Sequence, residues 1–302
     1  MEERIHYSTC PVCGSQQLQD IFQVKDYTVS QQLFTITECI HCTVRFTQDV
    51  PGPDAIAPYY KSTAYISHTN SRQGLLNQLY HWVRRRTLVR KSRLVQRAAG
   101  KQTGALLDVG SGVGAFLKEM QDRGWTCTGL EPDPDARAVA EKEIGVALAD
   151  NAHIYQLPDA QFDAITLWHV LEHVHDLQGY FQAFHRLLQP GGALLIAVPN
   201  YTAADAAYYK TFWAAYDVPR HLYHFSPQSM QVLAEQHGFR IEAWRPMWYD
   251  SFYVSLLSNR YRSGSYGWSN ALWNGLRSNF KALFNTKKCS SVIYVLKKES
   301  GR

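Results

Sequence analysis

Titratable and aromatic side chains gather in two short segments, residues 168–173 (WHVLEH) and 214–226 (AAYDVPRHLYHFS). An imidazole titrates close to pH 7, so His221 is the leading candidate for a base that takes a proton from an acceptor. Arg220 is a candidate for holding an anionic group of that acceptor, because a guanidinium binds such groups through paired hydrogen bonds. The other candidates are His173 and Tyr223 for catalysis, and Tyr216 and His224 for substrate binding. For each histidine, the alternative is a hydrogen-bonded packing role.

Residues 106–114 (LLDVGSGVG) combine a short apolar strand, an acid and a glycine-rich turn that runs into a helix. Glycine accepts positive φ and lets a ligand lie against the backbone, while the helix N-terminus adds partial positive charge. Glu131 ends the next strand, 23 positions after Asp108. A doubly wound sheet places an acid for ribose hydroxyls at an offset of roughly 20 residues. The turn and the acid together predict a ligand that carries a ribose.

Four segments in this order resemble the class I S-adenosylmethionine-dependent methyltransferases. They are the glycine turn, the strand that ends at Glu131, residues 161–174 (QFDAITLWHVLEHV) and residues 187–200 (LLQPGGALLIAVPN). The G-x-G-x-G spacing also differs from the G-x-G-x-x-G of a pyrophosphate site. The resemblance implies an α/β fold with a doubly wound, mostly parallel, seven-stranded Rossmann-like sheet and S-adenosylmethionine as cofactor.

The resemblance also implies where the cofactor lies. The methionine end would contact the turn and its acid, the ribose would contact the end of the second strand, and the adenine would follow a short third strand over residues 146–149. The His169 and His173 side chains would line the pocket. In that order, the cofactor candidates are Asp108, Gly110, Ser111, Gly112 and Gly114, then Glu131 and Pro132, then Asp150, Asn151 or Ala152.

Four of the six cysteines form two C-x-x-C pairs, Cys10 with Cys13 and Cys39 with Cys42. Each pair can bring two thiolates to one ion at about 2.3 Å, and two pairs complete a tetrahedral zinc site with no open position for water. Strand-like residues lie between the pairs, as is typical of a zinc ribbon. We therefore predict a small zinc-ribbon module over residues 1–50, with zinc in a structural role.

The apolar content of 45% and the charged content of 19% are globular values for a chain of 302 residues. There is no run of 18 apolar residues and no apolar signal segment, so we expect no transmembrane segment and a cytoplasmic protein. Residues 51–100 are expected to form a linker and a basic helix that carries no acid. Residues 101–302 are expected to form the methyltransferase domain, with an insertion at 245–289.

The insertion is rich in aromatic and basic residues, and its sequence fits a lid, a dimer surface or a patch that meets a lipid-like molecule. Three functions are consistent with the sequence. The first is methylation of a small molecule such as a sugar nucleotide, an isoprenoid or a lipid-linked metabolite. The second is methylation of RNA, held by the zinc module and the basic helix. The third is cofactor binding without catalysis. The acceptor, the methylated atom and the oligomeric state are not predicted.

Overall fold

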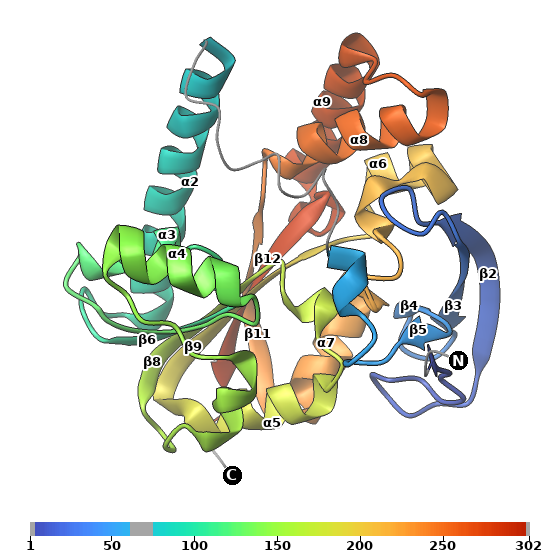
Figure 1. Cartoon of the computed structure of the whole chain (residues 1–302). Coiled ribbons are helices and arrows are strands. Elements are labelled where there is room, and N and C mark those ends of the chain that lie inside the picture. Colours follow the sequence, from blue (N-terminus) through green and yellow to red (C-terminus); the bar gives the residue numbers. More distant parts are fainter. Residues whose placement is uncertain (1–3, 61–74, 300–302) are drawn as a thin grey trace.

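The computed structural model describes residues 4–60 and 75–299, with side chains of the long helix α2 (Leu75–Ala99) described from residue 83 onward. A six-stranded sheet with the order β11-β12-β9-β8-β6-β7 forms its centre (Figure 1). Four strands are parallel, and β12 and β11 are added antiparallel to β9. Their bounds are β6 Ala105–Val109, β7 Thr126–Leu130, β8 Phe162–Trp168, β9 Leu188–Pro199, β11 Phe239–Pro246 and β12 Ser291–Lys298.

The predicted α/β sheet is confirmed, with one difference at its edge. The expected third strand, residues 146–149, makes a single parallel bridge between Ala149 and Leu130. The next residue, Asp150, caps the 3-10 helix η2 (Asn151–Gln156) by accepting from the Ala152 amide. Because this cap turns the chain into a helix, the extended segment ends before a ladder forms. The sheet therefore has six strands in the described part of the chain.

Helices cover both faces of the sheet, because successive residues of a buried strand point to opposite sides. Leu106 of β6 packs in a cluster with Val95 of α2 and with Phe116 of α3 (Ala115–Gln121). The next residue, Leu107, packs in the cluster that contains α5 (Leu177–Leu187) and α7 (Pro227–Gln236). Helix α4 (Pro134–Ile144) lies beside α3. The carboxyl ends of β6, β7, β8 and β9 therefore meet at one edge of a helix-covered sheet.

The N-terminal module forms its own small sheets beside this domain (Figure 1). Strand β1 (Arg4–Ile5) pairs with β5 (Val50–Pro51). Strands β2 (Leu18–Lys25), β3 (Leu33–Cys39) and β4 (Arg45–Thr47) form an antiparallel sheet, and β10 (Tyr223–His224) joins it at the edge of β4. Since β10 comes from the segment after β9, the module and the larger domain share one sheet.

The predicted insertion is a helical hairpin of α8 (Asp250–Ser263) and α9 (Trp268–Phe284). Buried Asp205 of α6 (Ala204–Tyr209) attaches it, because its carboxylate accepts from Ser278 of α9, Ser290 before β12 and the Trp213 indole at 2.7–2.9 Å. Short 3-10 helices fill the connections: η1 Ala57–Tyr60, η3 Leu171–His173, η4 Lys210–Phe212, η5 Ala214–Tyr216 and η6 Thr286–Lys288. Within the described ranges, no helix is both long and apolar enough to span a bilayer.

Candidate active site

The glycine turn and Glu131 meet at the carboxyl edge of the sheet. Gly110, Gly112 and Gly114 all have positive φ, and a side chain at Gly110 would collide with Val170. The Glu131 carboxylate is buried and accepts from the Gly112 amide at 2.7 Å and from the Asp133 amide at 3.0 Å. Burial raises the pKa of Glu131, and these two bonds offset part of the rise. The turn and the acid predicted to bind one ligand therefore touch each other.

Asp108 lies below the turn at the end of β6 and is almost completely buried. It accepts from the Thr166 hydroxyl at 2.6 Å, and its backbone carbonyl accepts from the Ser111 hydroxyl at 2.8 Å. Burial raises the pKa of Asp108 to about 7, although Thr166 and Lys91 favour its charged form. Lys91 of α2, which our sequence reasoning missed as a site residue, has its ammonium 4.3 Å from the Trp168 ring centre, and burial lowers its pKa to about 8. Helix α2 therefore supplies a partly buried cation to this edge.

The residues predicted at the ribose and adenine end also lie together. Arg137 donates to the carbonyls of Glu131 and Pro132 at 2.6 and 2.9 Å, and its guanidinium is 3.4 Å from the Asp150 carboxylate. The Asn151 Oδ1 is buried and accepts no hydrogen bond from the described residues. Space above Gly112 is open, because a Cβ built there meets nothing within 4 Å. Among the described residues, this edge therefore keeps an unpaired acceptor and open space beside the turn.

A cavity of about 420 Å³ opens next to this edge, between the residues after β8, the loop 214–221 and helix α8. Its walls carry a dense set of titratable groups: His169, Glu172, His173, Asp217, His221 and Asp250. Three tyrosines complete it, namely Tyr60 of η1 and Tyr253 and Tyr261 of α8. Ligands of open α/β sheets bind at this edge, so the cavity lies where an acceptor is expected.

An ion-pair chain runs along one wall of the cavity. The His169 ring is 3.3 Å from the Glu172 carboxylate on one side and 2.9 Å from the Asp250 carboxylate on the other. Burial alone would lower the pKa of His169, but Asp250 and then Glu172 outweigh it and raise this pKa to about 10. Burial would likewise raise the pKa of both carboxyls, and His169 instead holds them below their usual range. His169, which we predicted to line the cofactor pocket, therefore joins two carboxylates as a cation.

His173 and His221 form an edge-to-face pair with ring centres 4.6 Å apart. Each Nδ1 faces a backbone carbonyl, that of Arg220 at 3.0 Å and that of Ala215 at 2.8 Å. The Tyr60 hydroxyl also lies 3.1 Å from the His173 Nδ1. A carbonyl only accepts, so we assign the hydrogen to both Nδ1 atoms, with the Tyr60 oxygen as a second acceptor at His173, and the lone pair of each neutral ring to Nε2. Burial, reinforced by the neighbouring His221, lowers the pKa of His173 to about 4. The pair therefore offers the cavity two acceptor nitrogens of fixed tautomer.

Arg220 lines the cavity, but its guanidinium already has partners. It donates to both carboxylate oxygens of Asp217 and to the Tyr59 carbonyl. The Asp217 carboxylate also lies 3.9 Å from the His221 Nε2. We predicted that Arg220 anchors an anionic acceptor, whereas in this structure it positions Asp217 beside His221. Its charge is thus largely balanced within the protein.

Three predicted residues lie against the N-terminal module instead of in the cavity wall. The Tyr216 hydroxyl accepts from Arg45, the Tyr223 ring lies 6.4 Å from that of Tyr7 between ring centres, and the His224 ring meets the Thr47 hydroxyl at 3.1 Å. Pairing of β10 with β4 turns this part of the loop towards the module. We therefore give Tyr216, Tyr223 and His224 no part in the proposed chemistry.

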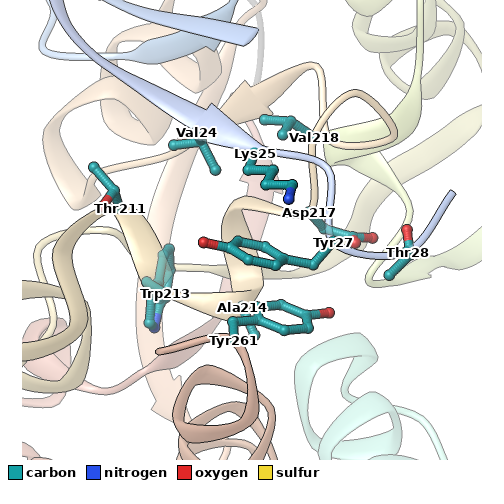
Figure 2. A pocket seen from close by; sticks show the side chains of 10 residues that line it. All are labelled: Val24, Lys25, Tyr27, Thr28, Thr211, Trp213, Ala214, Asp217, Val218 and Tyr261. Atoms are coloured by element: carbon teal, nitrogen blue, oxygen red, sulfur yellow. The ribbon is translucent and has the colours of Figure 1, made fainter. Parts of the chain in front are cut away.

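The module itself reaches the cavity, which we did not predict. Tyr27 stacks on Tyr261 of α8 with ring centres 4.4 Å apart, and Thr28 lines the cavity. Figure 2 shows these rings beside Asp217, where they enclose a small gap of about 10 Å³. The turn is held by Asp26, whose carboxylate accepts from the amides and hydroxyls of Thr28 and Ser30. The D-x-T-x-S pattern was the available signal, since it is typical of an Asx turn.

The four predicted metal ligands lie together in the module. Sγ of Cys10 is 3.5 Å from that of Cys42, Sγ of Cys13 is 3.6 Å from that of Cys39, and all four sulfurs lie within 4.8 Å of one another. A tetrahedral zinc ion with bonds of about 2.3 Å needs sulfurs roughly 3.8 Å apart. Gly14 and Thr43, which follow the two C-x-x-C turns, both have positive φ and close them. The donor set and spacing therefore fit one zinc ion.

Comparisons with known proteins agree with this arrangement. Residues 81–243 match a family described as a methyltransferase domain. Over 114 residues the chain is 33% identical to a ubiquinone biosynthesis O-methyltransferase of Pseudomonas paraeruginosa, covering 35% of this chain and 49% of that protein. It is 30% identical over 176 residues to a probable S-adenosylmethionine-dependent methyltransferase of Mycolicibacterium smegmatis, covering 56% and 63%. The chain thus spans about half the length of the first of these relatives and under two thirds of the second.

Two solved structures share the fold. A Haemonchus contortus phosphoethanolamine N-methyltransferase 2 in complex with S-adenosyl-L-methionine is 16% identical with a TM-score of 0.51, covering 93% of this chain and 71% of that one. A Burkholderia thailandensis 1,6-didemethyltoxoflavin-N1-methyltransferase is 15% identical with a TM-score of 0.50, covering 86% and 98%. At these identities the likeness concerns the fold alone.

Replacing His169 by Gln should remove a stabilising contribution that depends on pH. The folded-state pKa of His169, about 10, lies above its ordinary value of 6.5. The contribution is therefore complete below pH 6.5 and is lost as pH rises towards 10. Denaturant unfolding across this range should show a gap between wild type and His169→Gln that narrows with pH, whereas exposed His153→Gln should show no such trend. A gap that widens with pH would contradict the assignment.

Proposed function

Because the chain belongs to the methyltransferase-domain family, whose match covers residues 81–243, we propose that it transfers a methyl group from S-adenosylmethionine to a hydroxyl of a small-molecule acceptor. The observation that carries this proposal is the His173–His221 pair, two imidazoles of fixed tautomer on the wall of a cavity beside the cofactor edge. The relatives named as O-methyltransferases support oxygen as the methylated atom. We propose this methyl transfer as the activity of the whole protein.

The cofactor would be held by the edge that the sequence predicted. Gly110, Gly112 and the buried acid Asp108 would hold its methionine end, with Lys91 adding a cation near Asp108. Glu131 would accept from the ribose hydroxyls, and Asn151 Oδ1 would accept from the adenine amino group. When bound, S-adenosylmethionine supplies an electrophilic methyl group on a positively charged sulfur. The residues of the chain then have to align the acceptor and remove its proton.

His221 would remove that proton. Its Nδ1–H donates to the Ala215 carbonyl, which fixes the ring and leaves Nε2 as the acceptor for the hydroxyl proton. Asp217, 3.9 Å from Nε2, would stabilise the imidazolium that forms. Arg220 would hold Asp217 in place through its two hydrogen bonds. His173, whose pKa is lowered to about 4, would remain neutral and orient the acceptor through its own Nε2.

The acceptor would be a small molecule with a ring or an apolar part. A cavity of about 420 Å³ is within the range for drug-sized ligands and is too small for a folded RNA element. Tyr253 and Tyr261 of α8 and Tyr60 supply aromatic surface. With the Arg220 charge already balanced by Asp217, we expect a neutral reacting end rather than a phosphate.

The four cysteines would bind zinc in a structural role, because four thiolates complete a tetrahedron and leave no position for water. The ion would fix the module whose turn at residues 26–30 brings Tyr27 and Thr28 to the cavity. Zinc would therefore act on the active site through its shape, with no part in the chemistry.

Replacing His221 by Ala should lower turnover by roughly 10²–10⁴-fold, the usual effect of losing a general base. Affinity for S-adenosylmethionine should stay within about twofold of wild type, because His221 lies on the acceptor side of the edge. The assay is transfer of label from methyl-labelled S-adenosylmethionine into the small-molecule fraction of a cell extract. His6→Ala, at an exposed histidine in the module, is the matched control. Full activity of His221→Ala would end its role as base.

Replacing Cys39 by Ser should abolish stoichiometric zinc and lower the free energy of unfolding by more than about 4 kcal/mol, as expected for a lost metal site. Metal analysis of the purified full chain and denaturant unfolding measure the two effects. Cys127→Ser, outside the cluster, should keep one zinc per chain. A purified wild-type chain that contains no zinc would contradict the site. So would a chain whose free energy of unfolding stays the same after chelation.

A further inference from the structure

Helix α9 exposes its large apolar side chains and buries its small ones, the opposite of an ordinary surface helix. The residues that it buries are small, namely Ala271, Asn274, Gly275, Ser278 and Ala282. The residues that it exposes are large and apolar, each with 50–79% of its surface accessible. They are Trp268, Leu272, Trp273, Leu276, Phe280, Leu283 and Phe284, which we call the α9 stripe. At about 100° per residue, the two sets fall on opposite sides of the helix, so the stripe points away from the domain.

The small residues on the buried side are required by close packing. A Cβ on Gly275 would come within 2.5 Å of the Phe252 ring of α8, and Ser278 donates to buried Asp205. The helix therefore cannot rotate to bury its aromatic side without losing these contacts. The stripe is a fixed feature of the folded chain, and an apolar face of this kind marks an interaction site.

The sequence that carries the α9 stripe has charge of one sign. Residues 251–298 contain eight lysines and arginines and no aspartate or glutamate. Arg277, Lys281 and Lys288 are exposed on or just after α9. Tryptophan and phenylalanine on one face of a helix, with cations and no acid in the surrounding sequence, is a composition typical of helices that lie in a membrane interface.

A second basic element projects from the same end of the molecule. Figure 1 shows α2 and the α8–α9 hairpin extending beyond the sheet in the same direction. Arg84, Arg85 and Arg90 of α2 are exposed, and the Arg90 guanidinium is 5.9 Å from the ring centre of Tyr249, next to the start of α8. This end of the molecule therefore presents apolar side chains together with further positive charge.

We infer that the α9 stripe docks on an anionic lipid bilayer, with α9 lying in the interface and the cations of α9 and α2 facing lipid phosphates. A second copy of the chain fits less well, because two such faces would bring cations against cations with no acid to pair them. Helix α8 connects this face to the cavity, because α8 packs against α9 and its residues Tyr253 and Tyr261 line the cavity. Docking would thus bring the cavity close to acceptors that reside in the membrane.

The test is co-sedimentation of the full chain with vesicles of phosphatidylcholine alone or mixed with phosphatidylglycerol. Wild type should bind the mixed vesicles, and binding should weaken with added salt. The double variant Trp273→Glu/Phe280→Glu should bind at least about tenfold more weakly, because two large apolar side chains no longer enter the bilayer. Leu33→Glu, at a residue 60% exposed in the N-terminal module, is the matched control and should bind like wild type.

Charge is tested with Arg277→Gln/Lys281→Gln against Lys142→Gln/Arg240→Gln, which removes two exposed cations elsewhere. Only the first pair should weaken binding to the mixed vesicles. Sizing and unfolding measurements on every variant confirm that the folded state is intact. The inference is overturned if the wild-type chain does not bind vesicles, or if the stripe variant binds them as well as wild type. It is also overturned if wild type is a dimer and the stripe variant, unlike the others, is a monomer, or if the chain binds RNA but not vesicles. Vesicle binding requires no methyl transfer, so its failure leaves the proposed function standing.

Discussion

The arrangement of the cavity depends on keeping one negative charge buried. Glu172 is completely inaccessible to solvent, and its Oε2 receives no hydrogen bond from the described residues. A buried carboxylate is stable only with a compensating charge, and His169 supplies it while also pairing with Asp250 of α8. The Glu172 carbonyl accepts from the Leu222 amide at 2.7 Å, which fixes the loop that carries His221. The ion pairs thus join the strand end to the insertion, and the backbone hydrogen bond of Glu172 adds the loop.

The local parts of this structure could be predicted from sequence. Glycine at positive φ, an acid at a strand end and two C-x-x-C pairs each impose their geometry on a few neighbouring residues. The glycine turn accordingly contacts Glu131, and the four cysteines lie together in their own cluster. The third strand was the weakest local pattern, and it reduces to one bridge at Ala149. His173 and His221 were chosen for residue type and position, and both line the cavity.

Long-range contacts determine what the sequence could not predict. Whether Tyr223 faces the cavity depends on the pairing of β10 with β4, in which Tyr223 lies opposite Phe46, 177 residues earlier in the chain. That pairing turns Tyr223 to the N-terminal module. The same docking brings Tyr27 onto Tyr261. The sequence of α9 has large apolar residues on one side of the helix and small residues on the other. Only the folded structure shows that the side with the small residues is the buried one. In each case the deciding partner lies far away in sequence, where neither spacing nor propensity carries information.

We propose that the edge formed by the glycine turn, Glu131 and Asn151 holds S-adenosylmethionine. Calorimetric titration of S-adenosylmethionine into the full chain tests it most directly. We expect one saturable site in wild type, unchanged binding in Glu143→Ala at an exposed acid of α4, and weaker binding in Glu131→Ala. The loss should be roughly 1–3 kcal/mol, or about 5- to 150-fold in affinity, as for a charge-assisted hydrogen bond. A wild-type chain that does not bind, or a Glu131→Ala chain that binds equally well, would contradict the account.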